Sequence, residues 1–193
     1  MRHVIGAALA AVLFSSAAMA QSVSGVAQTN AAGETTTIFT IEPQRQVSAA
    51  DYVKMSADAI NYRIAAAQIA LRKAERDDVK AFAKADLASA KRSQDALMAA
   101  LANKDRRIAR PSTKLSSQRA ASIELLNKAK DSFDNLYLTQ MAQEAPTMWA
   151  LQKGYALEGS DPALKQVATL FVPTIENSYT VVKGLTPAGL AAR

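Results

Sequence analysis

Residues 48–101 read SAADYVKMSADAINYRIAAAQIALRKAERDDVKAFAKADLASAKRSQDALMAAL, and this stretch decides the fold. It contains neither Gly nor Pro, and it is rich in Ala, Lys and Leu, which favour helical backbone. Because nothing in the stretch breaks a helix over so many residues, we expect long helices here.

Two helices are predicted inside this stretch. Ser48 is placed to cap the first, with Asp51 three residues later in the capping-box position. Apolar residues then recur at steps of three and four, which is typical of one buried helix face; they are Val53, Ala57, Ile60, Ile64, Ala67, Leu71 and Ala74. The acidic pair Asp77–Asp78 favours a new helix N-terminus through the helix dipole. The second helix is expected to end near Asn103.

The rest of the chain predicts two further helices. Residues 104–116 form a connection, and a third helix runs from Ser117 to Leu157 with a bend or break near Lys130. A fourth begins at Asp161–Pro162, an N-cap followed by a proline at the first helical position. Pro146 and Pro173 should kink their helices, because the proline ring removes a backbone hydrogen bond. Short connections between long helices predict an all-α fold, an antiparallel four-helix bundle over residues 48–185, with 186–193 as a tail.

The start of the chain has the pattern of a secretory signal peptide. Residues 1–20 have a basic start, an apolar run and the ending Ala18-Met19-Ala20, so we expect cleavage after Ala20 and a periplasmic or secreted protein. The apolar run is shorter than the roughly 20 residues that span a bilayer, so the cleaved protein is not expected to be transmembrane. Residues 21–47 are expected to be a flexible segment; an ordered extended strip is the alternative for residues 35–41.

The composition excludes several kinds of chemistry. The chain has no Cys, and its one His is His3, inside the predicted leader. Catalysis by Ser–His–Asp or Cys–His, zinc sites built on His or Cys, haem held by His and disulfides are therefore excluded from the mature chain. We expect a protein that is not an enzyme, with no catalytic residue, no metal and no cofactor.

Four short motifs occur in order: Val79-Lys80-Ala81-Phe82-Ala83, Phe133-Asp134-x-x-Tyr137 with Met141, Gly159-x-Asp161-Pro162-x-Leu164-Lys165, and Val172-Pro173. Through them, residues 50–185 resemble a bacterial exported family of ferritin-like four-helix proteins of unknown function, often labelled outer-membrane or periplasmic proteins. The resemblance implies a metal site made by an inward Glu on the first helix and one His on each other helix. Those positions fall on Arg63, Ala90, Ala145 and Ser178, which implies that the site is degenerate here.

Charged residues nevertheless lie near the predicted apolar faces. Asp86 and Glu144 fall on the inward faces of the second and third helices, Glu176 lies beside that of the fourth, and Arg63 lies beside that of the first. A buried charge needs a partner, so we hypothesise that Arg63 pairs with Asp86 or Glu144 at the former site. The alternative is that all three charges lie at the edges of these faces and reach water. Tyr137 is expected to be a core ring with a hydrogen-bonded hydroxyl.

One end of the bundle is predicted to be basic. Residues 91–130 contain ten basic and three acidic residues, and the connection holds Arg106, Arg107, Arg110 and Lys114. This pattern over residues 104–119 predicts contact with an anionic envelope component or an acidic protein. Nucleic acid is not expected, since no aromatic residues interleave with the basic ones. A solvated loop that keeps the protein soluble is the alternative.

Three functions are compatible with these observations. The first is an exported, non-enzymatic helical bundle with a degenerate ferritin-like metal site and a structural or binding role in the cell envelope. The second is a carboxylate-based metal-binding protein or ferritin-like oxidoreductase. The third is an interaction module of the envelope that acts through the basic end.

Overall fold

The computed structural model describes residues 26–29, 35–39, 41–102 and 107–187. The predicted signal peptide, Arg106 and residues 188–193 lie outside these ranges.

The predicted all-helical fold class is confirmed for the described residues, with one short strand pair added. The helices are α1 (Ala49–Lys73), α2 (Asp77–Ala100), α3 (Ser117–Lys128), α4 (Phe133–Glu158) and α5 (Pro162–Leu185). The helix expected over 117–157 is divided, because the backbone at Ala129 is extended, with φ −60° and ψ 141°.

Local signals in the sequence set the helix starts. The Ser48 hydroxyl accepts a hydrogen bond from the backbone N–H of Asp51 at 3.1 Å, which caps α1. Asp161 caps α5 in the same way, with Pro162 at the first helical position. Pro146 and Pro173 lie inside α4 and α5, which continue as helices through both residues. The kinks at these prolines stay predictions.

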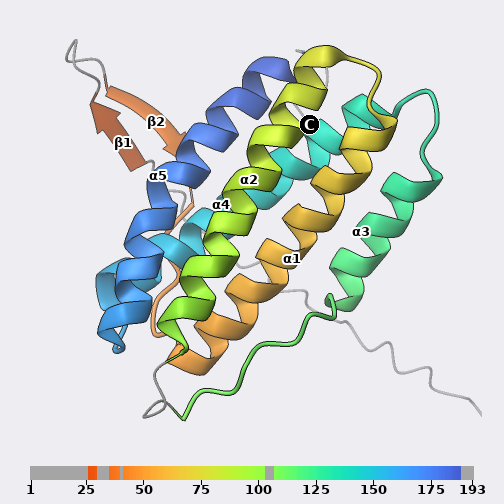
Figure 1. Cartoon of the computed structure of the whole chain (residues 1–193). Coiled ribbons are helices and arrows are strands. Elements are labelled where there is room, and N and C mark those ends of the chain that lie inside the picture. The colour runs from red at the N-terminus through yellow and green to blue at the C-terminus, as the bar shows by residue number, and fades with distance from the viewer. Residues whose placement is uncertain (1–25, 30–34, 40, 103–106, 188–193) are drawn as a thin grey trace, which may run out of the picture.

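The four long helices lie side by side, as Figure 1 shows. α1 packs against α2 and α4, and α5 packs against the same two helices. The short α3 lies beside α1, on the side away from α5, and also touches α4. The interior between the long helices is apolar and falls into two clusters, one around Trp149 and Tyr52 and the other around Phe82 and Phe133.

The segment before α1 is in contact with α4. β1 (Val26–Thr29) and β2 (Thr35–Phe39) form an antiparallel pair, and residues 41–47 follow. The backbone N–H of Gln44 donates to the carbonyl of Ala150 at 2.8 Å. A Cβ atom at Gly154 would lie 1.9 Å from the Gln44 carbonyl oxygen, so this close approach requires glycine.

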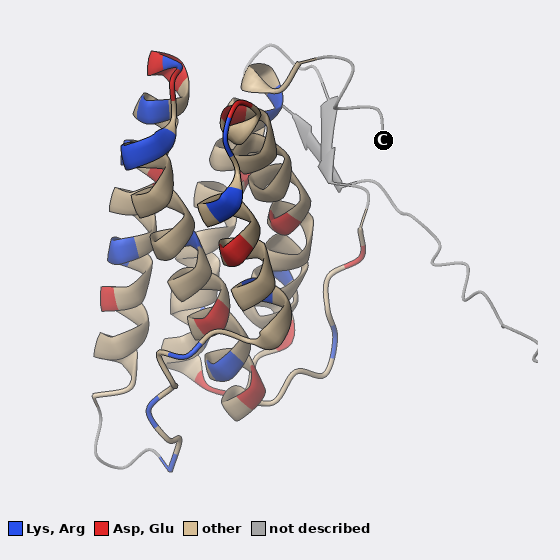
Figure 2. Ribbon diagram, turned by 90° about the vertical axis from the view of Figure 1, so that its right-hand side faces the viewer, with Lys and Arg blue, Asp and Glu red and all other residues tan. Residues whose placement is uncertain are grey.

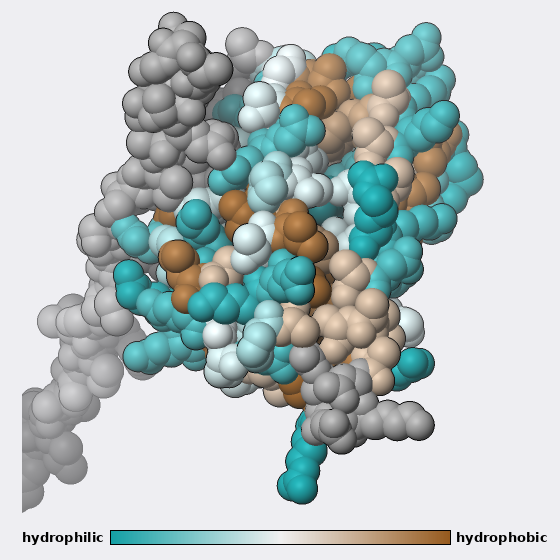
Figure 3. Space-filling view, turned by 60° about the vertical axis from the view of Figure 1, so that its left-hand side comes forward, coloured by the Kyte–Doolittle hydropathy of each residue, from teal (hydrophilic) through white to brown (hydrophobic). Residues whose placement is uncertain are grey.

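The surface of the described residues mixes polar and apolar side chains. On the face shown in Figure 3, hydrophobic side chains are interspersed among hydrophilic ones. Leu170 and Val181 on α5 are exposed, and scattered apolar residues of this kind are normal on a protein surface. No helix in the described ranges has both the length and the apolar character needed to cross a membrane.

Candidate functional site

A polar layer separates the two apolar clusters at the middle of the long helices. Each long helix contributes one residue to it: Arg63 from α1, Asp86 from α2, Glu144 from α4 and Ser178 from α5. Along each long helix, the core residues towards one end belong to one apolar cluster and those towards the other end belong to the other cluster. These four side chains line an internal cavity of about 20 Å³, which is large enough for one water molecule.

An ion pair occupies one side of this layer. The Arg63 Nη2 donates to Asp86 Oδ1, and the two side chains are only 6% and 1% exposed. The Ser178 hydroxyl donates to the same carboxylate oxygen at 3.3 Å. The other oxygen, Asp86 Oδ2, is buried and accepts no hydrogen bond from the residues that the structure describes. One oxygen of Asp86 therefore binds a permanent cation, while the other is available as an acceptor as far as the described residues are concerned.

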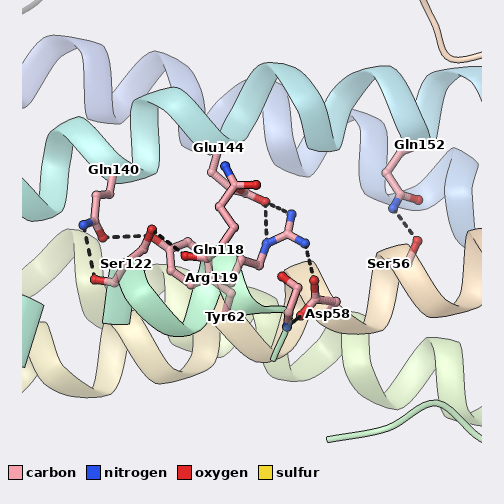
Figure 4. A network of polar contacts seen from close by, with 10 residues as sticks. Ser56, Asp58, Tyr62, Gln118, Arg119, Ser122, Gln140, Glu144 and Gln152 are labelled. Carbon is pink, nitrogen blue, oxygen red and sulfur yellow. Dashed lines mark hydrogen bonds and ion pairs between the residues drawn. The ribbon is translucent and has the colours of Figure 1, made fainter. Parts of the chain in front are cut away.

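Glu144 is bound to a different arginine, which comes from α3. Arg119 donates through Nε and Nη2 to Glu144 Oε1, and through Nη1 to Asp58 Oδ2 at 2.7 Å. Figure 4 shows the guanidinium between the two carboxylates. The backbone N–H of Ser116 also donates to Asp58, at 2.9 Å. One cation thus ties α3 to both α1 and α4.

The two carboxylates bound by Arg119 differ in acidity because they differ in burial. Burial raises the pKa of Glu144 above its usual value, although the positive charge of Arg119 opposes this. Burial acts in the same direction on Asp58 but is outweighed by hydrogen bonds from Ser116 and Arg119, so the pKa of Asp58 is lowered.

The positions that the family resemblance singles out lie close together. Arg63, Ala145 and Ser178 all line the small internal cavity. Ala90 is fully buried on α2, four residues after Asp86. Across the described ranges, no three His, Cys, Asp or Glu side chains are grouped so that they could hold a metal ion.

The expectation for Tyr137 is wrong in one respect. Its ring is fully buried, as expected, but its hydroxyl has no hydrogen-bond partner among the described residues. The ring packs against Phe82 and Phe133, with centroids 5.9 and 6.2 Å away. Apolar packing therefore sets the position of the hydroxyl. Burial raises the pKa of Tyr137, and the nearby Asp86 carboxylate adds to this.

Sequence reasoning missed two polar clusters that involve tyrosines. The Tyr62 hydroxyl donates to Gln140 Oε1 at 2.8 Å, and Gln140 donates to the Ser122 carbonyl. The Tyr52 hydroxyl donates to Gln152 Oε1 at 2.7 Å. The available signals were Gln140 and Gln152, two glutamines among the apolar residues of the α4 sequence. The indole of Trp149 donates to Glu176 at 2.9 Å, which gives that carboxylate a buried partner.

The basic connection is exposed where it is described. Arg107, Arg110 and Lys114 are exposed, and no acidic residue of the described ranges pairs with them. Figure 2 shows basic and no acidic residues along this part of the connection. Arg119, in contrast, points inward, so the basic segment divides into an exposed part and one structural arginine.

Comparisons with known proteins place the chain in a family. Neither the curated proteins nor the solved structures gave a match. The family described as Domain of unknown function (DUF4142) matches residues 34–185, which include every described helix and the polar layer. Because this match covers most of the 193 residues, the chain belongs to the DUF4142 family.

Proposed function

We propose that this chain is an exported, non-enzymatic binding protein of the cell envelope, built on an antiparallel ferritin-like four-helix bundle with a degenerate metal site. One observation supports the degenerate metal site in this proposal. Arg63 places a fixed positive charge in the polar layer, where it is paired with Asp86. A guanidinium stays charged at every pH at which proteins are folded.

Charge and space argue against a divalent metal in this layer. Di-iron sites in four-helix bundles need several inward carboxylates and histidines. Here the Asp86 and Glu144 carboxylates are each bound by an arginine. A divalent cation in the cavity of about 20 Å³ would meet the guanidinium of Arg63 as a like charge.

The helix contacts support the bundle. α1 and α2 are joined by residues 74–76 alone, and α4 and α5 by residues 159–161. Helices joined so closely pack as antiparallel neighbours. Each long helix also packs against one helix of the other pair.

Metal titration tests the proposal. Elemental analysis of the purified protein and titration with Mn²⁺ should give no saturable binding. Arg63→Glu should gain a site, because it adds a third carboxylate beside Asp86 and Glu144, whereas the control Arg63→Gln should not. Stoichiometric binding by the wild type would instead support the carboxylate-based metal protein.

Export is supported by the leader pattern in residues 1–20. Expression of the full chain in a bacterial host, followed by mass analysis of the periplasmic fraction and the medium, should recover a chain that starts at Gln21. Recovery of the uncleaved chain from the cytoplasm alone would contradict the proposed location.

The exposed basic connection favours a second candidate, contact with an anionic envelope component. Vesicles containing phosphatidylglycerol should bind the protein, and binding should weaken as salt is added. Neutralising Arg106, Arg107 and Arg110 together with Gln should remove the binding. An equal number of Lys→Gln changes at Lys84, Lys153 and Lys165, elsewhere on the surface, is the control. Equal binding by the triple arginine variant would reject this candidate.

A further inference from the structure

A second, much larger cavity lies between α1, α3 and α4. Its volume is about 630 Å³, within the range of about 300–1,000 Å³ that is usual for small-molecule sites. The connection before α3 lines it through Ser112, Lys114, Leu115 and Ser116, and α3 lines it through Gln118, Arg119 and Ser122. Glu144 and Met148 line both this cavity and the small internal one. We call it the α3 cavity.

The Arg119 network forms a rigid part of the α3 cavity wall. Its guanidinium has five N–H groups, and three of them are used on Glu144 and Asp58. The other two have no acceptor among the described residues, although the side chain is only 19% exposed. Because the two carboxylates hold the guanidinium in place, it can bind an acceptor on a ligand without being ordered first.

Neutral polar side chains make up much of the remaining wall. They are amides and hydroxyls from α3, α4 and the connection before α3, namely Ser112, Gln118, Gln143 and Thr147, together with Gln140 and Ser122, which are already hydrogen-bonded within the protein. An amide both donates and accepts hydrogen bonds, and so does a hydroxyl. The rest of the wall is apolar, from Met55, Ala59, Leu115, Met148 and Leu151. A wall that combines hydrogen-bonding groups with apolar side chains matches the hydroxyls and the C–H faces of a sugar ring.

Two lysines at the α3 cavity indicate the charge of the ligand that it would bind. Lys54 and Lys114 line the α3 cavity, are exposed, and form no ion pair with any described residue. Within the wall, Asp58 and Glu144 outnumber Arg119 by one negative charge, and the two lysines bring the sum of the lining charges to +1. The α3 cavity therefore attracts a negative ligand.

We propose that the α3 cavity binds a small polyhydroxylated anion, a sugar acid of about one or two rings. Its carboxylate lies towards Lys54 and Lys114, and its hydroxyls meet the amides of α3 and α4. This proposal rests on the proposed binding role and adds a ligand class to it, at a place separate from the Arg63–Asp86 pair.

The test uses D-glucuronate as the probe and the full mature chain. Calorimetric titration should show glucuronate binding more tightly than D-glucose, which lacks the charge, and than acetate, which lacks the hydroxyls. Amide NMR shifts on adding glucuronate should concentrate in α1, α3 and α4. Failure of glucuronate to bind, or equal binding by glucose or by acetate, would overturn the proposal.

Variants place the ligand in the cavity. Lys54→Gln with Lys114→Gln should weaken glucuronate binding about tenfold, because two charge-assisted contacts are lost. The matched control is Lys84→Gln with Lys91→Gln, on the exposed face of α2. Thr147→Trp, at an exposed position of α4, should fill the cavity and abolish binding while the helical circular dichroism stays unchanged. Unaltered binding in both cavity variants would reject the site, whereas metal titration of the same proteins tests the interior layer independently.

Discussion

The effect of the Arg63–Asp86 ion pair on stability depends on its burial. Two charges buried between helices lose most of their hydration, and their mutual attraction offsets this only while both are present. Asp86 is bound on one oxygen by Arg63 and Ser178, and its other oxygen accepts no hydrogen bond within the described part of the chain. Loss of either member therefore leaves an uncompensated charge in the core.

Asp86→Ala should destabilise the protein by about 3–5 kcal/mol, because it leaves the Arg63 guanidinium buried without a partner. Urea unfolding followed by circular dichroism measures the change. Asp95→Ala, at an exposed position of the same helix, is the control and should change stability by less than about 0.5 kcal/mol. Equal stability of the two variants would mean that Arg63 reaches water.

Among the elements, α3 depends on polar contacts more than the other helices do. Its one fully buried side chain is Leu126. Arg119 binds its first turn to Asp58 and Glu144, and Lys73 donates to the carbonyls of Leu126, Asn127 and Ala129 at its other end. The charged side chains of Arg119 on α3 and Lys73 on α1 therefore fix the position of α3.

Asp58→Asn should weaken the attachment of α3 in a pH-dependent way. The pKa of Asp58 is lowered in the folded protein, so its charge stabilises the fold above the unfolded value, about 3.9. That stabilisation is lost as the pH falls through the lower folded value. We expect the variant to be about 1–2 kcal/mol less stable at pH 7, with the gap closing below about pH 4. Unfolding curves of both proteins over this range measure it; a gap that is independent of pH would contradict the ion pair with Arg119.

The segment before α1 is held to α4 by a backbone contact at Gly154. A glycine inside a helix usually costs about 0.5–1 kcal/mol relative to alanine. Gly154→Ala should instead destabilise the protein, by about 1–3 kcal/mol, since the added Cβ would meet the Gln44 carbonyl at 1.9 Å. Gly184→Ala, on α5 with no atom within 4 Å of the new Cβ, is the control and should be stabilising. Thermal unfolding of both variants measures the two changes in stability. If Gly154→Ala were stabilising like Gly184→Ala, residues 41–47 would not dock on α4.

At the scale of the whole molecule, the polar layer divides one helical interior into two apolar clusters. It also lies between the α3 cavity and a groove between α2 and α5, because Glu144 lines the former and Asp86 and Arg63 line the latter. Buried polar groups in such a layer add little stability compared with apolar residues of the same volume. We therefore expect the layer to contribute no more to the free energy of folding than an apolar layer of the same volume would.

Joint replacement of the pair tests this statement. Arg63→Met with Asp86→Leu should unite the two clusters and leave the protein as stable as the wild type or more stable by about 1–4 kcal/mol. The single change Arg63→Met, which leaves the Asp86 carboxylate alone, is the control and should be strongly destabilising. Chemical unfolding of the three proteins gives the comparison, and a double variant as unstable as the single one would show that the pair itself stabilises the fold.

The sequence by itself determined the helices, because their caps, their apolar repeats and the lack of Gly and Pro are local properties of the chain. It also indicated that Arg63, Asp86 and Glu144 lie near the interior, since helical spacing places them beside apolar residues. Only the tertiary structure decided which charges meet: Arg63 lies against Asp86, while Glu144 is bound by Arg119 of a separate helix. Arg119 lies in a basic stretch that reads as solvent-exposed, and its inward direction depends on how α3 packs. Contacts between residues far apart in the chain follow from the packing of helices, which no local pattern encodes.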